Sequence, residues 1–480
     1  MIRTAVSRPL RKTRLRDTAG HPSNAVTAIA SLTRAFGHTG AQLVLWPGWW
    51  DASSALDNSG GTWSAIRTNQ VGARFSFQVT GTRIAGAVID GSWHSARNWE
   101  SKQWKPNVGW WRVRRWTDGV AGAWVYGLRP VISDAGWIFA HDLDPAAVYR
   151  FDLEQTHFTD PNGWYVTLSN TTRLEYMREP SLFTPEASET AQEFGSFAQI
   201  SGIVTTAGAT FQEIVDARTP LNVLLLADSN AVGVVDPSDG NATVATYTPG
   251  APWSTTAYDE LGHATSWQRL ILEAWCDANN RALVLHNPSY GGLWIADMDA
   301  DIRAGYLTLH AGISSNVRDR YTKRTGYTSG AFPTFTARGR DNLSGYAPDL
   351  IVLAFVTNDQ LINSIVYLSD PNFGGVTFQN NIVSLVNAMR TTWPSAKMLS
   401  VNNHRSDASV APQVTSHTYF DLAHGAAGLN HSATNWLRYA DIRALVSTAT
   451  LPDGLVHLTR PQHVAIAAAL QPTLNALMAL

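Results

Sequence analysis

Residues 221–233 read LNVLLLADSNAVG, a short apolar run that stops abruptly at Asp228, Ser229 and Asn230. The run shows little polar alternation, which is typical of a parallel β-strand covered on both faces. Its three closing polar residues are common in turns and at helix N-caps. The carboxyl end of a parallel strand is also where open α/β sheets bind their ligands. The rest of the chain has to decide between these two interpretations.

Three later segments are apolar runs of the same kind: RALVLHN at 281–287, DLIVLAF at 349–355 and AKMLSVNN at 396–403. Helical segments lie among them, at 266–278 with Ser266 as the expected N-cap, at 377–390 with Thr377, and at 459–470 with Thr459 and with Pro461 in the first turn. Strands that alternate with helices predict a doubly wound α/β domain with a parallel sheet.

The N-terminal part of the chain has a different pattern. Of the 19 tryptophans, 13 lie between Trp46 and Trp164. The same region alternates with period two, as in ARFSFQVTG at 73–81, which predicts a shared face for Phe75, Phe77 and Val79. Short alternating strands between Gly, Asp and Asn turn signals predict an antiparallel β-sandwich. The predicted organisation is an N-terminal arm (1–45), a Trp-rich β-sandwich (46–185), a linker (186–217) and the α/β domain (218–480).

The bulk composition argues against several classes of protein. The 480 residues carry a formal net charge of −2, which gives no general attraction to nucleic acid or anionic membranes. No stretch approaches the ~18 apolar residues of a membrane span, and no apolar signal segment follows the basic residues 1–16. The single cysteine, Cys276, excludes an intrachain disulfide. We therefore expect a cytoplasmic or virion-associated protein without a nucleic-acid partner.

Two clusters of potential metal ligands occur in the chain, His141 with Asp142 and Asp144, and His404 with Asp407. Neither follows a known ligand spacing, and turn or surface chemistry explains both. The sequence therefore predicts neither a metal ion nor another cofactor.

Four segments carry polar residues at a predicted strand end or just before the last helix: LADSN (226–230), LHNPSYGG (285–292), AFVTND (354–359) and LPDGLVHLT (451–459). In a doubly wound sheet these places converge on one edge. A serine hydroxyl becomes a good nucleophile when an imidazole takes its proton, and a carboxylate orients that imidazole. Ser229, His457 and Asp453 supply these three groups.

Ester cleavage also needs fixed donors for the oxyanion of its tetrahedral intermediate. Backbone N–H groups at Gly291 or Gly292 and the side-chain amide of Asn358 offer such donors. Asp228 and Asp359, which neighbour these residues, are expected to brace their loops through hydrogen bonds rather than to react. Each residue alone is explained as a turn, cap or core residue, so the prediction depends on all four segments together.

In this order the four segments resemble the sequence blocks of the SGNH (GDSL-like) hydrolase superfamily. Its members are esterases, lipases and carbohydrate deacetylases on a flavodoxin-like three-layer α/β/α fold. The resemblance covers the predicted α/β domain. It implies Ser229 as the nucleophile, His457 as general base and then acid, and Asp453 as the orienting carboxylate. It implies an oxyanion hole made by the backbone N–H groups of Ser229 and Gly292 and the side-chain amide of Asn358.

The resemblance leaves two assignments open. Three residues separate Asp453 from His457 where two are usual in the family, so a Ser–His dyad helped by a backbone carbonyl is an alternative to a triad. Gly292 is preferred over Gly291 because it lies five residues after Asn287, the spacing expected for that loop.

Two further departures bear on function: Ala227 and Val356 stand where family members usually have glycine. Together with the longer Asp–His spacing they favour one alternative, a glycan-binding or virion structural protein on an inactive hydrolase fold, because a fold does not determine function. A lipase or thioesterase is another alternative. The polar, Gly- and Pro-rich segment 234–256 argues against its long acyl groove.

The Trp-rich sandwich resembles the jelly-roll module that precedes the hydrolase domain in some SGNH carbohydrate esterases. Aromatic rings beside polar groups, as in 91–104 and 109–116, suit stacking on sugar rings, whereas burial in the core explains other tryptophans. The sequence thus predicts a serine esterase that deacetylates an O-acetylated carbohydrate or cleaves another small-acyl ester. A bacteriophage tail component fits the absence of a signal peptide and disulfides, and the sequence leaves homo-oligomer or virion assembly open.

Overall fold

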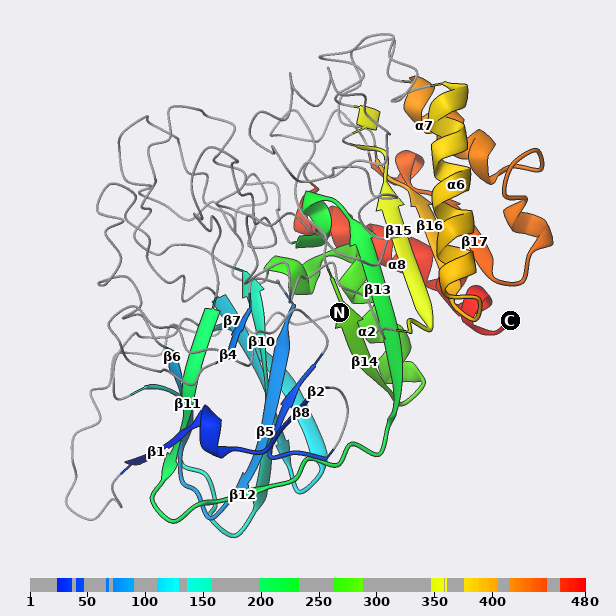
Figure 1. The fold of residues 1–480 in the computed structure, drawn as a ribbon. Coiled ribbons are helices and arrows are strands. Elements are labelled where there is room, and N and C mark those ends of the chain that lie inside the picture. Colours follow the sequence, from blue (N-terminus) through cyan, green and yellow to red (C-terminus); the bar gives the residue numbers. More distant parts are fainter. Residues whose placement is uncertain are drawn as a thin grey trace, which may run out of the picture.

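The computed structural model describes residues 24–36, 40–46, 66–68, 72–89, 110–128, 136–157, 198–232, 262–287, 347–357, 359–360, 375–404, 414–446 and 458–480. They form two parts, a pair of β-sheets followed by an α/β part that begins with β13 (Figure 1). This arrangement confirms the predicted fold class. The basic segment 1–16 lies outside the described residues.

The α/β part contains a five-stranded sheet in which every neighbouring pair is parallel. Its spatial order is β14 (Arg281–His286), β13 (Thr219–Ala227), β15 (Leu350–Phe355), β16 (Lys397–Asn402) and β17 (Leu437–Asp441). Counted along the chain this is the order 2-1-3-4-5, which is flavodoxin-like. The strand order reverses at β13, so the carboxyl ends of β13 and its neighbours form the edge where such sheets bind ligands.

Four helices cover the two faces of this sheet (Figure 1): α2 (Trp267–Ala278), α6 (Val376–Thr392), α7 (Val414–His424) and α8 (Arg460–Met478). Buried side chains of α6 and α7 pack on one face against Leu224 and Leu226 of β13. Those of α2 and α8 pack on the other face against Val223 and Leu225. Because alternate residues of the stretch 223–227 enter two cores, this part of β13 is apolar throughout.

Two of the three predicted helix caps are confirmed. The Ser266 hydroxyl accepts from the backbone N–H of Arg269, and Thr459 forms a capping box with Gln462. The prediction of Thr377 as a cap is wrong: α6 begins at Val376, so Thr377 lies inside the helix. Its N-cap is Gly375, whose φ of 144° suits glycine.

The N-terminal part is a sandwich of two mainly antiparallel sheets. One sheet has the order β1 (Asn24–Ala28), β11 (Ala198–Thr206), β6 (Ala85–Ile89) and β9 (Trp137–Ala140), with β4 (Ile66–Thr68) beside β11. The other has the order β2 (Arg34–Phe36), β3 (Leu43–Leu45), β5 (Arg74–Thr80), β10 (Val148–His157), β7 (Trp110–Thr117) and β8 (Val120–Leu128), with β12 (Thr210–Gln212) beside β5. Among the described strand pairs of these two sheets, only β2 and β3 run parallel.

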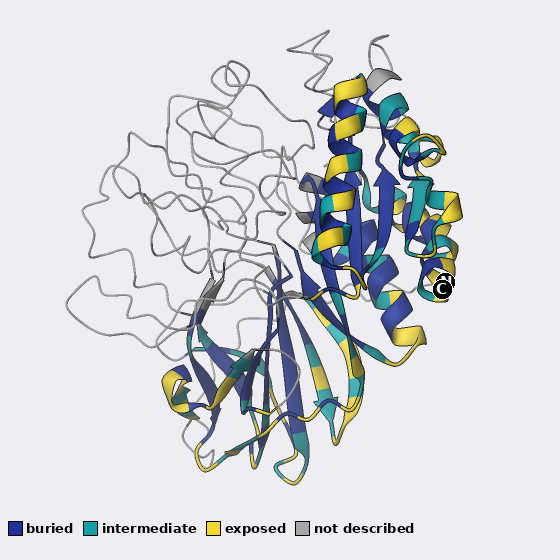
Figure 2. Ribbon diagram, turned by 45° about the vertical axis from the view of Figure 1, so that its right-hand side comes forward, coloured by how far each residue is buried: buried dark blue, intermediate teal, exposed yellow. Residues whose placement is uncertain are grey.

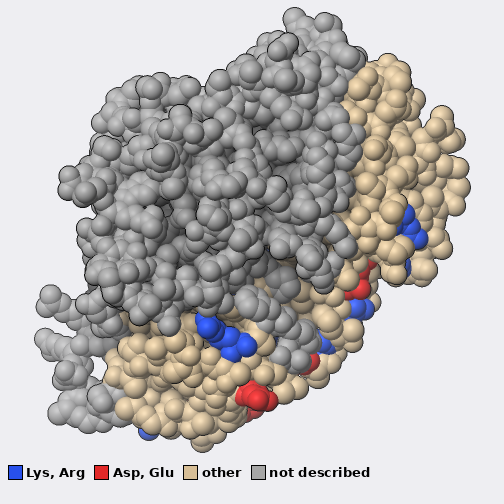
Figure 3. Space-filling view, in the orientation of Figure 1, with Lys and Arg blue, Asp and Glu red and all other residues tan. Residues whose placement is uncertain are grey.

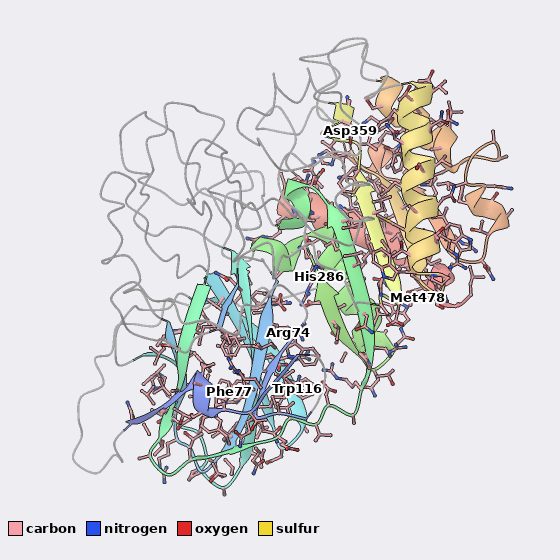
Figure 4. The ribbon with its side chains drawn as sticks, viewed as in Figure 1. Arg74, Phe77, Trp116, His286, Asp359 and Met478 are labelled. Carbon is pink, nitrogen blue, oxygen red and sulfur yellow. The ribbon has the colours of Figure 1, made fainter. Side chains whose placement is uncertain are left out.

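The sandwich core lies between these sheets. Phe75, Phe77 and Val79 are fully buried in it, which confirms their predicted shared face. Figure 2 shows buried residues along the sandwich strands, and Figure 4 labels Phe77. The ring of Phe77 lies 5.4 Å from that of Phe151 on β10. Strands from residues 24–45 and 198–212 belong to these sheets, although they lie outside the range 46–185 assigned to the sandwich from sequence. β1, β2, β3 and β12 have five residues or fewer, and a register shift between Ile200 and Gly202 interrupts β11, so their alternation gave little signal.

Buried charges join the two parts. Glu154 on β10, with no exposed surface, accepts from Arg112 of β7 at 2.7 Å and from Arg269 of α2 at 2.6 Å. Arg112 and Arg269 also pair with Glu273 of α2. Arg74 lies 3.4 Å from Glu154 and donates to the Leu283 carbonyl of β14 at 3.3 Å. The outer face of the sandwich is therefore fastened to the α/β part.

Two properties of the described surface bear on partners. In the face shown in Figure 3, most described atoms belong to uncharged residues, and the charged side chains are scattered. No described helix combines the length and apolar character of a membrane span.

Candidate active site

The end of β13 is held by Asp228, which is 1% exposed. Its Oδ1 accepts from the backbone N–H of Asn230 at 3.0 Å, and its carbonyl accepts from the N–H of Ala231 at 3.0 Å. These bonds turn the chain into a short 3-10 helix, η3 (Ser229–Val232), with Ser229 as its first residue. Asp228 braces the turn, as predicted. The strand thus stops because a carboxylate caps the next turn.

The segment before α8 lies against this turn. The backbone N–H of Leu458 donates to Asn230 Oδ1 at 3.3 Å, and both residues are fully buried. The capping box fixes the next residue, since the Thr459 N–H donates to Gln462 Oε1 at 2.7 Å. Leu458 directly follows His457 in the chain, and Asn230 directly follows Ser229.

The ends of the neighbouring strands are tied to the same turn. Asn287, just after β14, donates from Nδ2 to the Ala231 carbonyl at 3.2 Å. Asn403, just after β16, donates from Nδ2 to Asp228 Oδ2 at 3.3 Å, and its backbone N–H donates to Phe355 O at 3.1 Å. Side-chain amides therefore tie the carboxyl ends of β14 and β16 to the turn after β13, and a backbone hydrogen bond ties the end of β15 to that of β16. Figure 4 shows His286 and Asp359 at the ends of two of these strands.

The chain after β15 has an unusual backbone. Val356 is 1% exposed and has φ of 95°, in a region where a β-branched residue is a true outlier. The N–H of Gln360 donates to the Val356 carbonyl at 2.8 Å, which closes one turn, and Thr357 Oγ1 donates to the His404 carbonyl at 2.9 Å. Such a conformation costs about 1–3 kcal/mol and persists where its surroundings enforce it.

The predicted site residues stand as follows. Ser229 is described only in its backbone, at the start of η3. The others lie outside the described residues: Gly291, Gly292, Asn358, Asp453 and His457. What the structure brings together is their described sequence neighbours, above all Asn230 with Leu458.

Three residues of this edge were missed in the sequence, namely Asn230, Asn287 and Asn403. Each is an asparagine that follows an apolar run, and asparagine in that position is also an ordinary turn residue. The repeated occurrence of Asn at successive strand ends was the available signal.

Five of the 13 N-terminal tryptophans have described side chains, and they have structural roles. Trp46, Trp111 and Trp137 are at most 7% exposed. Arginine guanidinium groups lie over Trp116 and Trp124. For Trp116 they belong to Arg150 at 4.7 Å and Arg218 at 4.8 Å from the ring centroid, and for Trp124 to Arg112 at 4.1 Å. Cation–π contacts therefore explain the mixed Arg/Trp pattern of 109–116 without a sugar. The remaining tryptophans of the stretch lie outside the described side chains.

Two further groups with potential chemistry lie among the described residues. Cys276 of α2 is buried in the core, and burial raises the pKa of its thiol to about 12. Among the described residues, no group of three His, Cys, Asp or Glu side chains could hold a metal ion. His141, Asp142 and Asp144 are described and do not form such a group, whereas Asp407 lies outside the described residues.

Comparisons with known proteins place this geometry in a fold. No protein-family model and no curated protein sequence matches the chain. Solved structures do match. A family two carbohydrate esterase from Cellvibrio japonicus is 14% identical with a TM-score of 0.51, over 95% of this chain and 98% of that one. A family two enzyme with a carbohydrate-binding domain from Corynascus thermopiles (Myceliophthora fergusii) is 14% identical with a TM-score of 0.50, over 91% and 99%.

An acetyl xylan esterase from the rumen bacterium Butyrivibrio proteoclasticus is 12% identical with a TM-score of 0.50, over 94% of this chain and 99% of that one. At such low identity these matches establish the fold and no residue role. Each match includes both the β-rich part and the α/β part of the chain. The chain therefore has the fold of these carbohydrate esterases, with a β-sandwich ahead of a parallel-sheet domain.

Proposed function

We propose that this protein is a serine esterase that removes acetyl or other small acyl groups from carbohydrate. Ser229 is the nucleophile, His457 the general base and acid, and Asp453 the carboxylate that orients it. The backbone N–H groups of Ser229 and Gly292 and the Asn358 amide form the oxyanion hole. The predicted place on a phage particle remains a prediction from sequence.

The reaction follows from these roles. Ser229 Oγ attacks the ester carbonyl carbon while His457 takes the hydroxyl proton, and the carbonyl oxygen becomes an oxyanion. When the carbon–oxygen bond to the sugar breaks, His457 gives the proton to the leaving oxygen. Water then attacks the acyl–serine with His457 again as base, which releases the acid and restores the enzyme.

The observation that carries the proposal is the hydrogen bond from Leu458 N–H to Asn230 Oδ1. It joins the residue after the proposed nucleophile to the residue after the proposed base. These positions are 228 apart in sequence, and only a folded edge of this kind brings them together.

The conformation of Val356 also supports an active site over an inactive relic. Glycine adopts positive φ readily, and the family usually has glycine here. This chain keeps positive φ with a valine, at an energetic cost. A chain under no demand for this turn would be free to relax it.

The test is hydrolysis of p-nitrophenyl acetate and p-nitrophenyl butyrate by the wild type, Ser229→Ala and His457→Ala, beside acetate release from a panel of acetylated polysaccharides. Loss of a triad nucleophile or base costs several orders of magnitude in kcat. The matched control is Ser432→Ala, an exposed serine before β17. It should keep wild-type activity.

The outcomes separate the alternatives. Cleavage of acetate esters that Ser229→Ala abolishes supports the proposal. A strong preference for butyrate and longer chains would indicate a lipase or thioesterase instead. An inert wild type that binds glycans would indicate an inactive binding protein, and undiminished activity in Ser229→Ala would exclude the assigned nucleophile.

A further inference from the structure

A network of hydrogen bonds links the turn after β15 to helix α7. His417, which has no exposed surface, occupies its centre. Its Nε2 lies 2.7 Å from Gln360 Oε1, and its Nδ1 lies 2.5 Å from Asn402 Oδ1 at the end of β16. One imidazole therefore bridges two strand ends from a helix.

Asn402 and Asp421, at the far end of this hydrogen-bond network, fix the orientation of the imidazole. Asn402 Nδ2 donates to Asp421 Oδ1 at 2.7 Å and to the His417 carbonyl at 3.2 Å. With its amide nitrogen committed, Asn402 presents Oδ1 as an acceptor, so His417 Nδ1 carries a proton and donates. Asp421 also accepts from Arg443 at 2.6 Å and from Tyr439. The hydrogen-bond network therefore ends at the Asp421 carboxylate, which is paired with Arg443.

At the other end of this hydrogen-bond network, Gln360 belongs to a strained turn. The backbone of Gln360 closes the turn that starts at Val356, where φ is 95°. Asn358 lies between these two residues in the sequence. A strained turn keeps its shape only when surrounding contacts hold it. The contact of His417 with the Gln360 side chain is one such restraint.

We propose that His417 is a positioning residue for ester cleavage, which it serves by holding Gln360 and with it the turn that carries Asn358. This inference rests on the proposed function, in which Asn358 stabilises the oxyanion. His417 acts through Gln360 and touches neither the substrate nor the reacting atoms. The Asp421 anchor gives the imidazole a fixed position from which to do so.

The simpler role for His417 is to satisfy buried polar atoms and so to stabilise the fold. The two roles differ in their kinetic consequence. A merely stabilising residue affects the amount of folded enzyme, whereas a residue that positions an oxyanion donor affects transition-state stabilisation and therefore kcat.

Two substitutions separate the two ring contacts. His417→Asn places an amide nitrogen near Nδ1, so it keeps the Asn402 contact and loses the Gln360 contact. His417→Gln reaches the Nε2 position and keeps the Gln360 contact. The kinetics of both are measured with p-nitrophenyl acetate, beside chemical denaturation. The matched control is His424→Gln, a second fully buried histidine of α7.

We expect His417→Asn to lower kcat at least tenfold with KM changed less than about twofold, because removal of an oxyanion donor itself costs about 10²–10³-fold. His417→Gln should retain most of kcat. His424→Gln should lose stability without a change in kcat. Equal kcat in the two His417 variants and the wild type, or losses that only follow stability, would overturn the inference.

A second route avoids changing the histidine. Gln360→Met removes the hydrogen-bonding partner of His417 Nε2 and keeps the side-chain length, and should lower kcat like His417→Asn. In the double variant the two losses should not add, because both remove the same contact. Additive losses, or full activity of Gln360→Met in a folded protein, would overturn the inference while the esterase stands. If the wild type hydrolysed none of the esters, the proposed function would be wrong, and so would the role of His417 that rests on it.

Discussion

The backbone N–H of Leu458 donates to the side-chain oxygen of Asn230 at 3.3 Å, and this bond joins the start of the last helix to the turn after the first strand of the parallel sheet. Asn230 is held in turn, since its Nδ2 donates to Asp228 Oδ1 at 3.1 Å. Its amide is therefore oriented with the oxygen toward Leu458. One asparagine sets the distance between the two segments that carry the proposed nucleophile and base.

Asn230→Ala should therefore damage both stability and activity. It leaves the buried N–H of Leu458 without its acceptor, which costs about 1–3 kcal/mol in the free energy of unfolding. The segment before α8 loses its fixed distance from η3, so kcat should fall at least tenfold. Denaturation and p-nitrophenyl acetate kinetics measure the two effects. Asn222→Ala, at the opposite end of β13, is the control and should keep kcat; a normal kcat in Asn230→Ala would contradict the argument.

The strained φ of Val356 makes a second prediction. Val→Gly at a buried position loses packing and adds backbone freedom, and is ordinarily costly. At Val356 the same change relieves backbone strain of about 1–3 kcal/mol. Val356→Gly should thus lower the free energy of unfolding by clearly less than Val352→Gly, a buried residue of β15 in an ordinary strand. Urea denaturation of the pair decides it, and equal losses would mean that the turn carries no strain.

The sequence predicted the parallel sheet well because burial on both faces leaves a direct trace. Every residue of β15 is buried, and an uninterrupted apolar run such as 350–355 fits few other structures. Caps at Ser266 and Thr459 were also predictable, since a hydroxyl before a helix satisfies a free N–H group. At α6 this rule failed because Gly375 begins the helix without a side-chain bond.

Long-range pairings could not be predicted in the same way. Nothing local in the sequence links Arg112 to Glu273, which lie 161 residues apart, or Leu458 to Asn230. The polar surroundings of Trp116 were consistent with sugar stacking, whereas the groups over its ring include Arg150 of β10 and Arg218, the residue before β13. The edge that carries the candidate site was predictable because the carboxyl ends of strands in a doubly wound sheet converge on one edge. The asparagines that brace it were not, since asparagine after a strand is also an ordinary turn residue.

Glu154 is central to the junction between the two parts. Burial raises the pKa of its carboxyl, but attraction from Arg112, Arg269 and Arg74 outweighs burial and leaves that pKa below its ordinary value. Glu154→Gln removes the fully buried one of the two carboxylates that pair with Arg112 and Arg269. Breaking a buried ion pair by removing one partner typically costs about 3–5 kcal/mol. We expect a loss of this size in guanidinium chloride denaturation.

A graded comparison checks that burial is the cause. Glu273 binds the same arginines but has a side chain that is 22% exposed, so Glu273→Gln should cost less than Glu154→Gln. Asp277→Asn, on the exposed face of α2, should change stability by no more than about 0.5 kcal/mol. If Glu154→Gln were as mild as Asp277→Asn, the buried charges would not be what fastens the sandwich to the α/β part.

His424 should give the protein a specific loss of stability in mild acid. The pKa of its imidazole is lowered from 6.5 to about 4, chiefly by burial; the nearby His431 acts in the same direction, and the Phe420 carbonyl and Asp421 oppose it. The unfolded chain therefore takes up this proton at a higher pH than the folded chain. The stabilisation is complete above about pH 6.5 and is lost as the pH falls toward 4, by about 3 kcal/mol in total. His424→Phe keeps an aromatic ring against Tyr439, whose ring centroid lies 4.8 Å away, and cannot take up a proton.

The measurement is the difference in free energy of unfolding between wild type and His424→Phe from pH 8 to pH 4. Protonation of buried carboxylates such as Glu154 also lowers the free energy of unfolding in acid. These groups are present in both proteins, so their contribution cancels in the difference. Wild type should therefore weaken relative to the variant below pH 6.5 and level off near pH 4. A difference that stays constant across this range would show that His424 titrates normally, and that its ring is reached by water in the folded protein.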